Sequence, residues 1–225
     1  MADPFTTDDR KALCAAAAQV ATSGLVVGSS GNLSVRRGAH MLITPRSARL
    51  AAIDPADCVC VALADGSTDA AHDRPSEASS ESTLHRIAYA SVPDAQAVVH
   101  THSHFATVLS TLLDEIPPVH YVATTFGGPV RVAPYATFGS SDLAETVGQA
   151  LEGRTAALMA NHGAVATGRF LAAAVEQAHQ LEWLASVYWH ARVMGAPRIL
   201  AKDELDAVVA QSRALNYGAP QEAPA

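Results

Sequence analysis

This 225-residue sequence lacks three features that would each point to a particular class of protein. Its three cysteines, Cys14, Cys58 and Cys60, are too few for a disulfide framework. No apolar run reaches the length of a membrane span. No basic run interrupts a composition of 22 acidic against 15 basic residues. Nucleic acid and membranes are therefore not expected as partners.

The composition is that of a folded protein, with 49% apolar and 16% charged residues. No internal repeat, low-complexity linker or charge run divides the chain. We therefore expect one domain over residues 1–225, in which only residues 218–225 are flexible. The N-terminal stretch MADPFTTDDRK lacks an apolar core, so we expect no signal peptide and a cytoplasmic location.

Hydrophobic periodicity and turn residues predict the order of helices and strands. Helices are expected at residues 8–23, 81–91, 103–113, 140–152, 170–194 and 202–215. Strands are expected at residues 32–35, 40–44, 57–63, 96–102, 130–134, 155–160 and 164–167. Helices and strands mix without strict alternation, and some strands follow one another directly. This pattern indicates an α/β fold with a mixed, largely antiparallel sheet flanked by helices.

Three histidines alternate within the apolar stretch VVHTHSHFATV, residues 98–108. If residues 96–102 form a strand, His100 and His102 point to the same face. Two imidazoles placed in this way can chelate one divalent ion. An isolated His-x-His pair is also compatible with the polar face of an edge strand. His104 falls beyond the expected strand, where it is better placed to cover the next helix than to bind metal.

Two further residues would complete a set of metal ligands. His162 lies in Asn-His-Gly after an apolar strand, where Gly163 allows a tight turn. The alternative is that His162 is an ordinary turn residue. Glu81 starts a helix. The alternative is that it only provides a negative charge that the helix dipole favours at this end. Three imidazoles and one carboxylate would make a tetrahedral Zn²⁺ site. A carboxylate that can leave the metal becomes a base.

Two segments have the composition of anion sites. GSSGNLS, residues 28–34, and Ser79-Ser80 offer backbone N–H groups and small hydroxyls, the second pair at a helix N-terminus. Clusters of this kind are usually ordinary turns. Here one of them adjoins the candidate metal carboxylate, which makes a phosphate site the more interesting interpretation.

Taken together, these motifs resemble the class II aldolase and adducin family, and within it the fuculose-phosphate aldolases, over nearly the whole chain. The segments that carry the resemblance are GSSGNLSVR, ITPRS, SSE, PDAQAVVHTH and ANHG. The resemblance implies a three-layer α/β/α sandwich. It also implies one zinc ion per chain, or another divalent metal, held by Glu81, His100, His102 and His162. Glu77 is a rival acid, but the helix start after Ser80 favours Glu81.

The stretch IPPVHYVATTFGGPVRVAPYATFGS is similar to the fuculose-phosphate aldolase version, in which a tyrosine follows a histidine. This implies that Tyr121 is catalytic; a core tyrosine beside a strand is the alternative. The family implies a homotetramer of fourfold symmetry with active sites between subunits, so Tyr121 would serve the neighbouring site. Asn216-Tyr217-Gly218 resembles the C-terminal tyrosine segment of the family, which implies that Tyr217 closes over the site.

The resemblance also implies a phosphate site. Its candidate residues are Gly31, Asn32, Arg46, Ser47, Ser79 and Ser80. The family usually has Thr-Pro-Ser/Thr-Gly where this chain has Thr44-Pro45-Arg46-Ser47, so a glycine is replaced where backbone approaches phosphate. Arg46 either supplies a guanidinium fork to the phosphate or points to solvent. The sequence therefore leaves open whether the substrate is phosphorylated.

The implied reaction is reversible aldol cleavage of a small ketose 1-phosphate, similar to L-fuculose 1-phosphate. The products would be dihydroxyacetone phosphate and a short aldehyde such as lactaldehyde. Glu81 would move the proton at the nucleophilic carbon, and Tyr121 the proton on the aldehyde oxygen. A sugar-phosphate 4-epimerase, a methylthioribulose-phosphate dehydratase and a keto-acid-phosphate decarboxylase are alternatives on the same fold. A non-enzymatic adducin-like domain is disfavoured, because a scaffold has no need of an open metal site.

Overall fold

The computed structural model describes residues 3–68 and 77–217, and an eight-stranded sheet runs through it. The C-terminal segment expected to be flexible lies outside the described residues. The strands are β1 (Asn32–Arg37), β2 (His40–Ile43), β3 (Val59–Ala62), β4 (Ala97–Thr101), β5 (Glu115–Ile116), β6 (Val130–Ala133), β7 (Ala156–Met159) and β8 (Gly163–Gly168). Their order is β3-β2-β1-β4-β8-β7-β6-β5. Neighbours are antiparallel except for β6 and β7, which are parallel.

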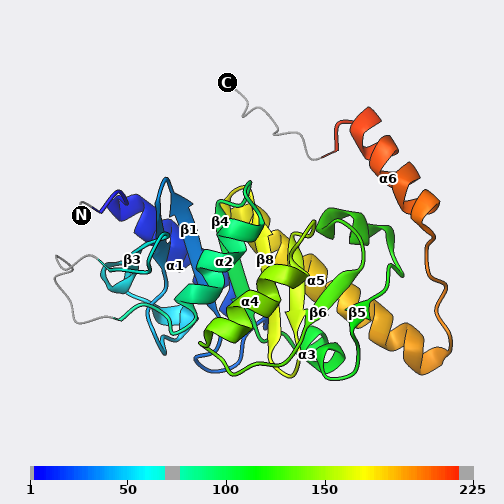
Figure 1. Ribbon diagram of the computed structural model, residues 1–225, viewed down its shortest axis with the longest axis horizontal. Helices are drawn as coiled ribbons and strands as arrows, with labels where there is room; N and C mark the ends of the chain where they lie inside the picture. Colours follow the sequence, from blue (N-terminus) through cyan, green and yellow to red (C-terminus); the bar gives the residue numbers. More distant parts are fainter. Residues whose placement is uncertain (1–2, 69–76, 218–225) are drawn as a thin grey trace.

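Helices cover both faces of this sheet, as Figure 1 shows. The helices are α1 (Thr7–Thr22), α2 (Ser82–Ser91), α3 (His104–Ser110), α4 (Ser141–Ala150), α5 (Leu171–Met194) and α6 (Lys202–Ala214), of which α6 stands apart from the sheet. Leu84 of α2 and Val147 of α4 join one hydrophobic cluster with Val98. Leu13 of α1 and Leu184 of α5 join another with Val99, because successive strand side chains point to opposite faces. The three-layer fold with a largely antiparallel sheet is therefore confirmed.

The first helix shows how local sequence sets an element. Thr6 Oγ1 accepts a hydrogen bond from the backbone N–H of Asp9 at 3.2 Å, and the Asp9 carboxylate accepts one from the Thr6 N–H at 2.7 Å. This capping box satisfies two N–H groups that the helix itself leaves unpaired. Leu13, Ala17 and Val20 recur at helical spacing and are all buried. The helix therefore begins and packs where the sequence predicted.

The central strand β4 holds the first candidate ligand. All five of its residues are buried. In β4, His100 lies opposite Asn32 of β1 on one side and opposite Val165 of β8 on the other. Hydrogen-bonded neighbours on both edges and helices over both faces therefore enclose this strand. The strand ends at Thr101, so His102 lies just beyond it; the expectation that His102 belongs to the strand was wrong by one residue.

Four short elements were not predicted from the sequence. They are β5 and the 3₁₀ helices η1 (Leu50–Ala52), η2 (Pro55–Asp57) and η3 (Tyr121–Phe126). In addition, α3 ends at Ser110, short of the expected Leu113. Hydroxyls account for this end, because Ser110 Oγ and Thr111 Oγ1 donate to the carbonyl oxygens of Thr107 and Val108. Such side-chain bonds compete with continuation of a helix.

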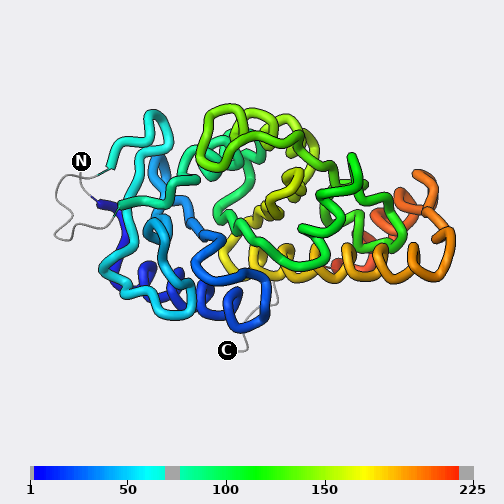
Figure 2. The backbone as a smooth tube through the Cα atoms, turned by 90° about the horizontal axis from the view of Figure 1, so that it is seen from below, coloured from blue at the N-terminus to red at the C-terminus, as the bar shows by residue number. Residues whose placement is uncertain are grey.

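The last two helices extend past the sheet (Figure 2). The far end of α5 exposes Val193 and Met194, and none of the described residues of α6 is buried. These helices therefore leave apolar surface that the rest of the described chain does not cover. None of the helices among residues 3–68 and 77–217 is long and apolar enough to cross a membrane.

Candidate metal centre and active site

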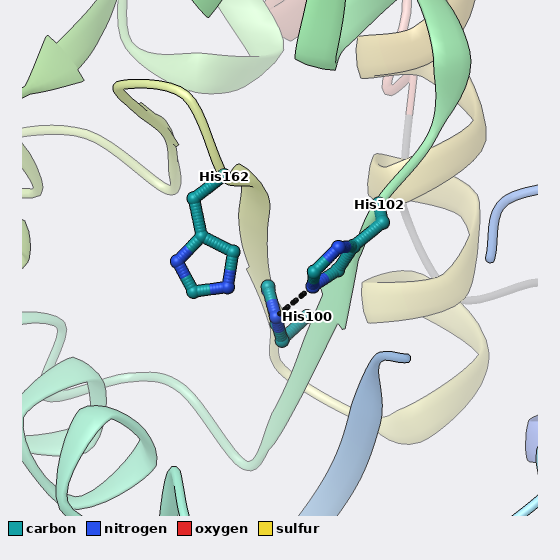
Figure 3. Close-up of side chains that lie close together, drawn as sticks. All are labelled: His100, His102 and His162. Atoms are coloured by element: carbon teal, nitrogen blue, oxygen red, sulfur yellow. Dashed lines mark hydrogen bonds between the residues drawn. The ribbon is translucent and has the colours of Figure 1, made fainter. Parts of the chain in front are cut away.

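Three imidazoles converge where β4 ends and β7 turns into β8, and Figure 3 shows their rings facing one another. The ring centroids of His100, His102 and His162 lie 4.8, 5.0 and 4.8 Å apart. Nε2 of His100 is 3.0 Å from Nε2 of His102. One ligand atom from each of the three lies within 4.8 Å of the others. The fold therefore brings together the three histidines that the sequence analysis selected.

Backbone contacts orient the His100 ring and position the main chain that carries the other two imidazoles. Nδ1 of His100 lies 2.9 Å from the carbonyl oxygen of Ala164 and donates a proton to it, which leaves Nε2 directed at the cluster. The backbone N–H of His102 donates to the carbonyl oxygen of Leu25 at 3.1 Å. His162 projects from a tight turn in which Asn161 takes a φ of +55°. The imidazoles are thus held by the sheet and its turns.

Glu81 supplies a fourth group from the start of α2, where its residue is only 7% exposed. Its Oε2 lies 3.2 Å from Nε2 of His100, and its Oε1 lies 3.3 Å from Nε2 of His162. Asn32 Nδ2 donates to Oε2 at 2.8 Å. Within the described ranges, Oε1 has no hydrogen-bond partner. A buried carboxylate oxygen without a donor is costly unless a cation or a proton faces it.

The electrostatics of the cluster set its protonation. Burial alone would raise the pKa of Glu81, but His100, Asn32 and His162 bring that pKa well below its usual value. Burial lowers the pKa of His102 to about 4, and the other two imidazoles add to the shift. Burial, followed by the charge of His100, also lowers the pKa of His162. Burial acts to lower the pKa of His100, but the Glu81 carboxylate outweighs it and raises that pKa. The cluster thus offers an ionised carboxylate and, at His102 and His162, neutral imidazoles, the forms that bind metal.

Three separations between these four side chains fit a divalent ion, while the ligand atoms of the three histidines lie within 4.8 Å of one another. A tetrahedral Zn²⁺ ion with ligand distances of about 2.0–2.2 Å separates adjacent ligand atoms by about 3.3 Å. The separations of 3.0, 3.2 and 3.3 Å given above are close to that value. A cation here would also give Oε1 of Glu81 its missing partner. The donor set and its spacing therefore fit a metal, while the assignment of each residue as a ligand stays a prediction.

Comparison with known proteins agrees with this geometry. The family described as Class II Aldolase and Adducin N-terminal domain matches residues 11–189. The chain belongs to this family. It is 41% identical over 216 residues to a 5-methylthioribulose-1-phosphate/5-deoxyribulose-1-phosphate aldolase of Rhodospirillum rubrum, covering 96% of this chain and 95% of that enzyme. The expected family and the expectation of an aldolase-type enzyme are confirmed.

Two further likenesses concern fuculose-phosphate aldolases. The L-fuculose phosphate aldolase of Escherichia coli strain K12 is 39% identical over 187 residues, which cover 83% of this chain and 85% of that enzyme. A solved structure of an L-fuculose 1-phosphate aldolase matches with a TM-score of 0.87 and 32% identity, covering 93% of this chain and 98% of that one.

In this class II aldolase-family chain, three segments meet beside Glu81. Thr44 N–H donates to the carbonyl oxygen of Leu33 at 3.0 Å, and Arg46 N–H donates to that of Glu77 at 2.8 Å. Ser47 takes a φ of +55°, the left-handed conformation that the glycine usual in the family adopts without strain. The backbone shape of this turn is therefore retained although the glycine is not.

The same contacts separate the two candidate acids. The Arg46 guanidinium pairs with the Glu77 carboxylate at 2.5 Å, and both side chains are more than half exposed. Glu77 is thus an exposed partner of Arg46, whereas Glu81 is the acid that lies with the histidines. Arg46 lines a surface hollow with Ser47 and Arg49.

The remaining phosphate candidates surround the same carboxylate. Ser79 is buried, and its hydroxyl accepts from the Glu81 N–H at 3.3 Å. A Cβ at Gly31 would lie 2.8 Å from the carbonyl oxygen of His100, so the loop approaches β4 as only glycine allows. A Cβ at Gly139 would lie 3.1 Å from the carbonyl oxygen of Ser80. The Asn32 side chain contacts Glu81 and His85. The phosphate contact predicted for this residue stays a prediction.

Both candidate tyrosines are exposed. Tyr121 begins η3 with 57% of its surface exposed and stacks on His120 at 4.2 Å between ring centroids. Tyr217 is 77% exposed. Neither makes a hydrogen bond or ring contact with the three clustered histidines in the part of the chain that the structure describes. His104, at the exposed start of α3, makes an edge-to-face ring contact with Phe105 and lies outside the cluster, as expected.

Sequence reasoning missed three buried polar residues next to the cluster. They are Ser34, His85 and Tyr89. Their hydrogen bonds link them to one another, and His85 is bonded to Asn32. A signal was present, because Glu81, His85 and Tyr89 are spaced by four and share one face of a helix.

Proposed function

We propose that this chain is a zinc-dependent aldolase that reversibly cleaves a small ketose 1-phosphate to dihydroxyacetone phosphate and a short aldehyde. The observation that carries the proposal is the convergence of three imidazoles on one buried carboxylate. Membership of the class II aldolase and adducin family supports it. A purely structural scaffold would have no reason to bury an ionised carboxylate against histidines.

The metal would be held by His100, His102 and His162, with Glu81 as the ligand that can leave. When bound, a divalent ion supplies Lewis-acid stabilisation of the negative charge that develops on substrate oxygens. Zinc is proposed because a set of three nitrogen donors and one oxygen donor suits it. One ion per chain follows from one such cluster among the described residues.

The residues of the chain then divide the proton transfers. Cleavage breaks the C3–C4 bond of the ketose, leaves its electron pair on C3, and releases a proton from the C4 hydroxyl. We assign the proton on the C4 oxygen to Tyr121 and the proton that C3 gains to Glu81. Glu81 suits this role because Asn32 holds one of its oxygens while the other has no donor.

We further propose that the enzyme is a homotetramer of fourfold symmetry in which Tyr121 serves the site of the neighbouring subunit. The exposure of Tyr121 supports this, since a phenol that faces solvent in one chain is available to another. Tyr217, also exposed, would close over the site. The uncovered apolar surface of α5 and α6 is consistent with burial between subunits.

The phosphate group is proposed to lie where the loops around Gly31-Asn32, Ser47 and Ser79-Ser80 meet, with the side chain of Arg46 at its edge. Backbone N–H groups and hydroxyls at such a junction bind phosphate oxygens. The Arg46–Glu77 pair lies on the rim, so a substrate phosphate would compete with Glu77 for the guanidinium.

For the substrate we propose 5-deoxyribulose 1-phosphate or 5-methylthioribulose 1-phosphate, with L-fuculose 1-phosphate as the second candidate. The relative named for the first two sugars matches 96% of this chain, and the relative named for the third matches 83%. Aldol cleavage of all three releases dihydroxyacetone phosphate. The aldehydes would be acetaldehyde, methylthioacetaldehyde and lactaldehyde, which differ only beyond the reacting carbon.

Product analysis tests this proposal. The purified protein with zinc is incubated with each of the three ketose phosphates, and dihydroxyacetone phosphate is measured by its enzymatic reduction with NADH. Release from a 5-deoxypentulose phosphate at higher kcat/KM than from L-fuculose 1-phosphate is expected. An isomeric sugar phosphate, a dehydrated product or carbon dioxide in place of dihydroxyacetone phosphate would instead identify an epimerase, a dehydratase or a decarboxylase.

A further inference from the structure

Behind Glu81 lies a continuous chain of buried hydrogen bonds that the aldol chemistry does not use. Ser34 and His85 are 0% exposed and Tyr89 is 3% exposed. Ser34 Oγ lies 2.8 Å from the Tyr89 hydroxyl and 2.7 Å from Nδ1 of His85. Nε2 of His85 lies 2.5 Å from Oδ1 of Asn32, whose Nδ2 lies 2.8 Å from Oε2 of Glu81. The chain thus ends at the carboxylate of the candidate metal site.

The direction of each bond in this chain is determined by chemistry. The ionised Glu81 carboxylate only accepts, so the amide nitrogen of Asn32 must face it. The amide oxygen of Asn32 therefore faces His85, and Nε2 of His85 must carry the proton. A neutral imidazole then accepts at Nδ1, so Ser34 donates to it and Tyr89 donates to Ser34. All the groups are satisfied in only one orientation of the Asn32 amide.

We propose that His85 is a positioning residue that acts through Asn32 on Glu81. By donating to Oδ1, His85 holds the amide with its N–H toward Oε2 of Glu81. That bond fixes one oxygen of Glu81 and leaves the other, which has no donor, facing His162 and the metal position. Without a donor from His85, the amide oxygen of Asn32 would be buried and unsatisfied, and rotation to relieve this would withdraw Nδ2 from Glu81.

This inference rests on the proposed metal site, and outer groups of this kind typically change metal affinity or activity by about 10–100-fold. A double-mutant cycle in metal affinity tests it. Zinc dissociation constants are measured by competition with a chromogenic chelator for the full-length wild type, His85→Phe, Asn32→Ala and the double variant. Tyr89→Phe is the matched control, since it removes a buried hydroxyl from the same chain and leaves both Asn32 bonds intact.

We expect His85→Phe and Asn32→Ala each to weaken zinc binding by about tenfold or more. The double variant should bind zinc no more weakly than Asn32→Ala, because His85 would have nothing left to act through. Tyr89→Phe should keep the wild-type affinity. Additive losses in the double variant, or an equal loss in Tyr89→Phe, would show a general effect of the buried pocket and overturn the inference.

Rescue gives a second readout if His85→Phe does not fold, as judged by circular dichroism. His85→Gln retains an N–H donor and should keep zinc affinity within about threefold of wild type, while Asn32→Ala does not. A tenfold loss in a folded His85→Gln would count against the inference. The double-mutant cycle needs no substrate. If none of the three ketose phosphates were cleaved, the proposed function would be refuted and the cycle could still be measured. If the enzyme were an active aldolase but the losses of zinc affinity in the double variant were additive, only the positioning role of His85 would be refuted.

Discussion

A Cβ atom on Gly163 would lie 2.2 Å from the carbonyl oxygen of Thr101. This contact joins the start of β8 to the end of β4, and each residue is the immediate neighbour of a clustered histidine, His162 and His102. The missing side chain therefore lets the two segments that carry the imidazoles approach each other. Only glycine allows this approach.

Gly163→Ala should consequently lower stability by about 1–3 kcal/mol, since the added methyl would meet backbone and not a flexible side chain. It should also reduce metal content, because β8 must move away from β4. Chemical denaturation and elemental analysis measure the two effects. Gly153→Ala, at a glycine with open space around the added Cβ but also with a positive φ, controls for backbone strain alone and should leave metal content unchanged.

The three clustered histidines should be needed for metal and the fourth histidine nearby should not. We expect the purified protein to hold one zinc ion per chain. His100→Ala and His162→Ala should lose most of it, because each removes an imidazole of the cluster. His104→Ala should retain it, since His104 lies at the exposed start of α3. Full occupancy in both of the first two variants would refute the ligand set.

Glu81→Gln should reduce turnover by about 10²–10⁴-fold, the range for a general acid–base group. Metal content should fall much less, because three imidazoles remain and the glutamine has nearly the same shape. Glu77→Gln is the matched control and should be mild, because Glu77 is exposed and paired with Arg46. Steady-state kinetics measure turnover and elemental analysis measures metal content. An inactive Glu77→Gln together with an active Glu81→Gln would show that Glu77, not Glu81, is the catalytic acid.

Tyr121→Phe should keep zinc and the tetramer but lose most aldol cleavage, because the ring remains and the phenolic proton is gone. If Tyr121 serves the neighbouring site, Tyr121→Phe chains reassembled with His100→Ala chains should recover part of the activity. Some hybrid sites would then combine an intact cluster with an intact tyrosine. Confirmed mixed tetramers no more active than either parent would contradict the assignment, and so would a monomer by light scattering.

Ser47→Gly should raise stability by roughly 0.5 kcal/mol or more. The left-handed conformation costs a residue with a Cβ about 1–2 kcal/mol, and glycine removes this cost. The larger conformational entropy that glycine loses on folding cancels only part of that gain. Ser47→Ala is the control: it keeps the Cβ and removes only the hydroxyl, so no gain is expected. Thermal unfolding measures both. A gain in Ser47→Ala as large as in Ser47→Gly would assign the effect to the hydroxyl.

Local chemistry in the sequence was sufficient for several elements. Thr6 and Asp9 form the capping box at which the first helix begins, and the Ser140 side chain caps α4 by accepting from the Leu143 N–H. Periodicity predicted α5 because its buried residues recur at helical spacing. These features depend on residues within one or two helical turns of each other, so they can be predicted from the sequence without knowledge of the fold.

The contacts between segments far apart in the sequence could not be predicted in this way. The parallel pairing of β6 with β7 and the short β5 depend on contacts between distant segments. The role of His85 was hidden for the same reason, because its partners Ser34 and Asn32 stand on β1, far away in sequence. The spacing of Glu81, His85 and Tyr89 places His85 on the helix face of Glu81, but no local feature identifies the strand residues that His85 contacts.

The sequence by itself therefore determined the local elements, the histidine and glutamate motifs and, through their combination, the family. Only the tertiary structure decided that His162 reaches His100 and His102, that Glu81 and not Glu77 lies with them, and that Asn32 faces that carboxylate. The physical reason is that these contacts arise from the pairing of β4 with β1 and β8. Strand pairing is set by packing over the whole sheet, and no short stretch of sequence encodes it.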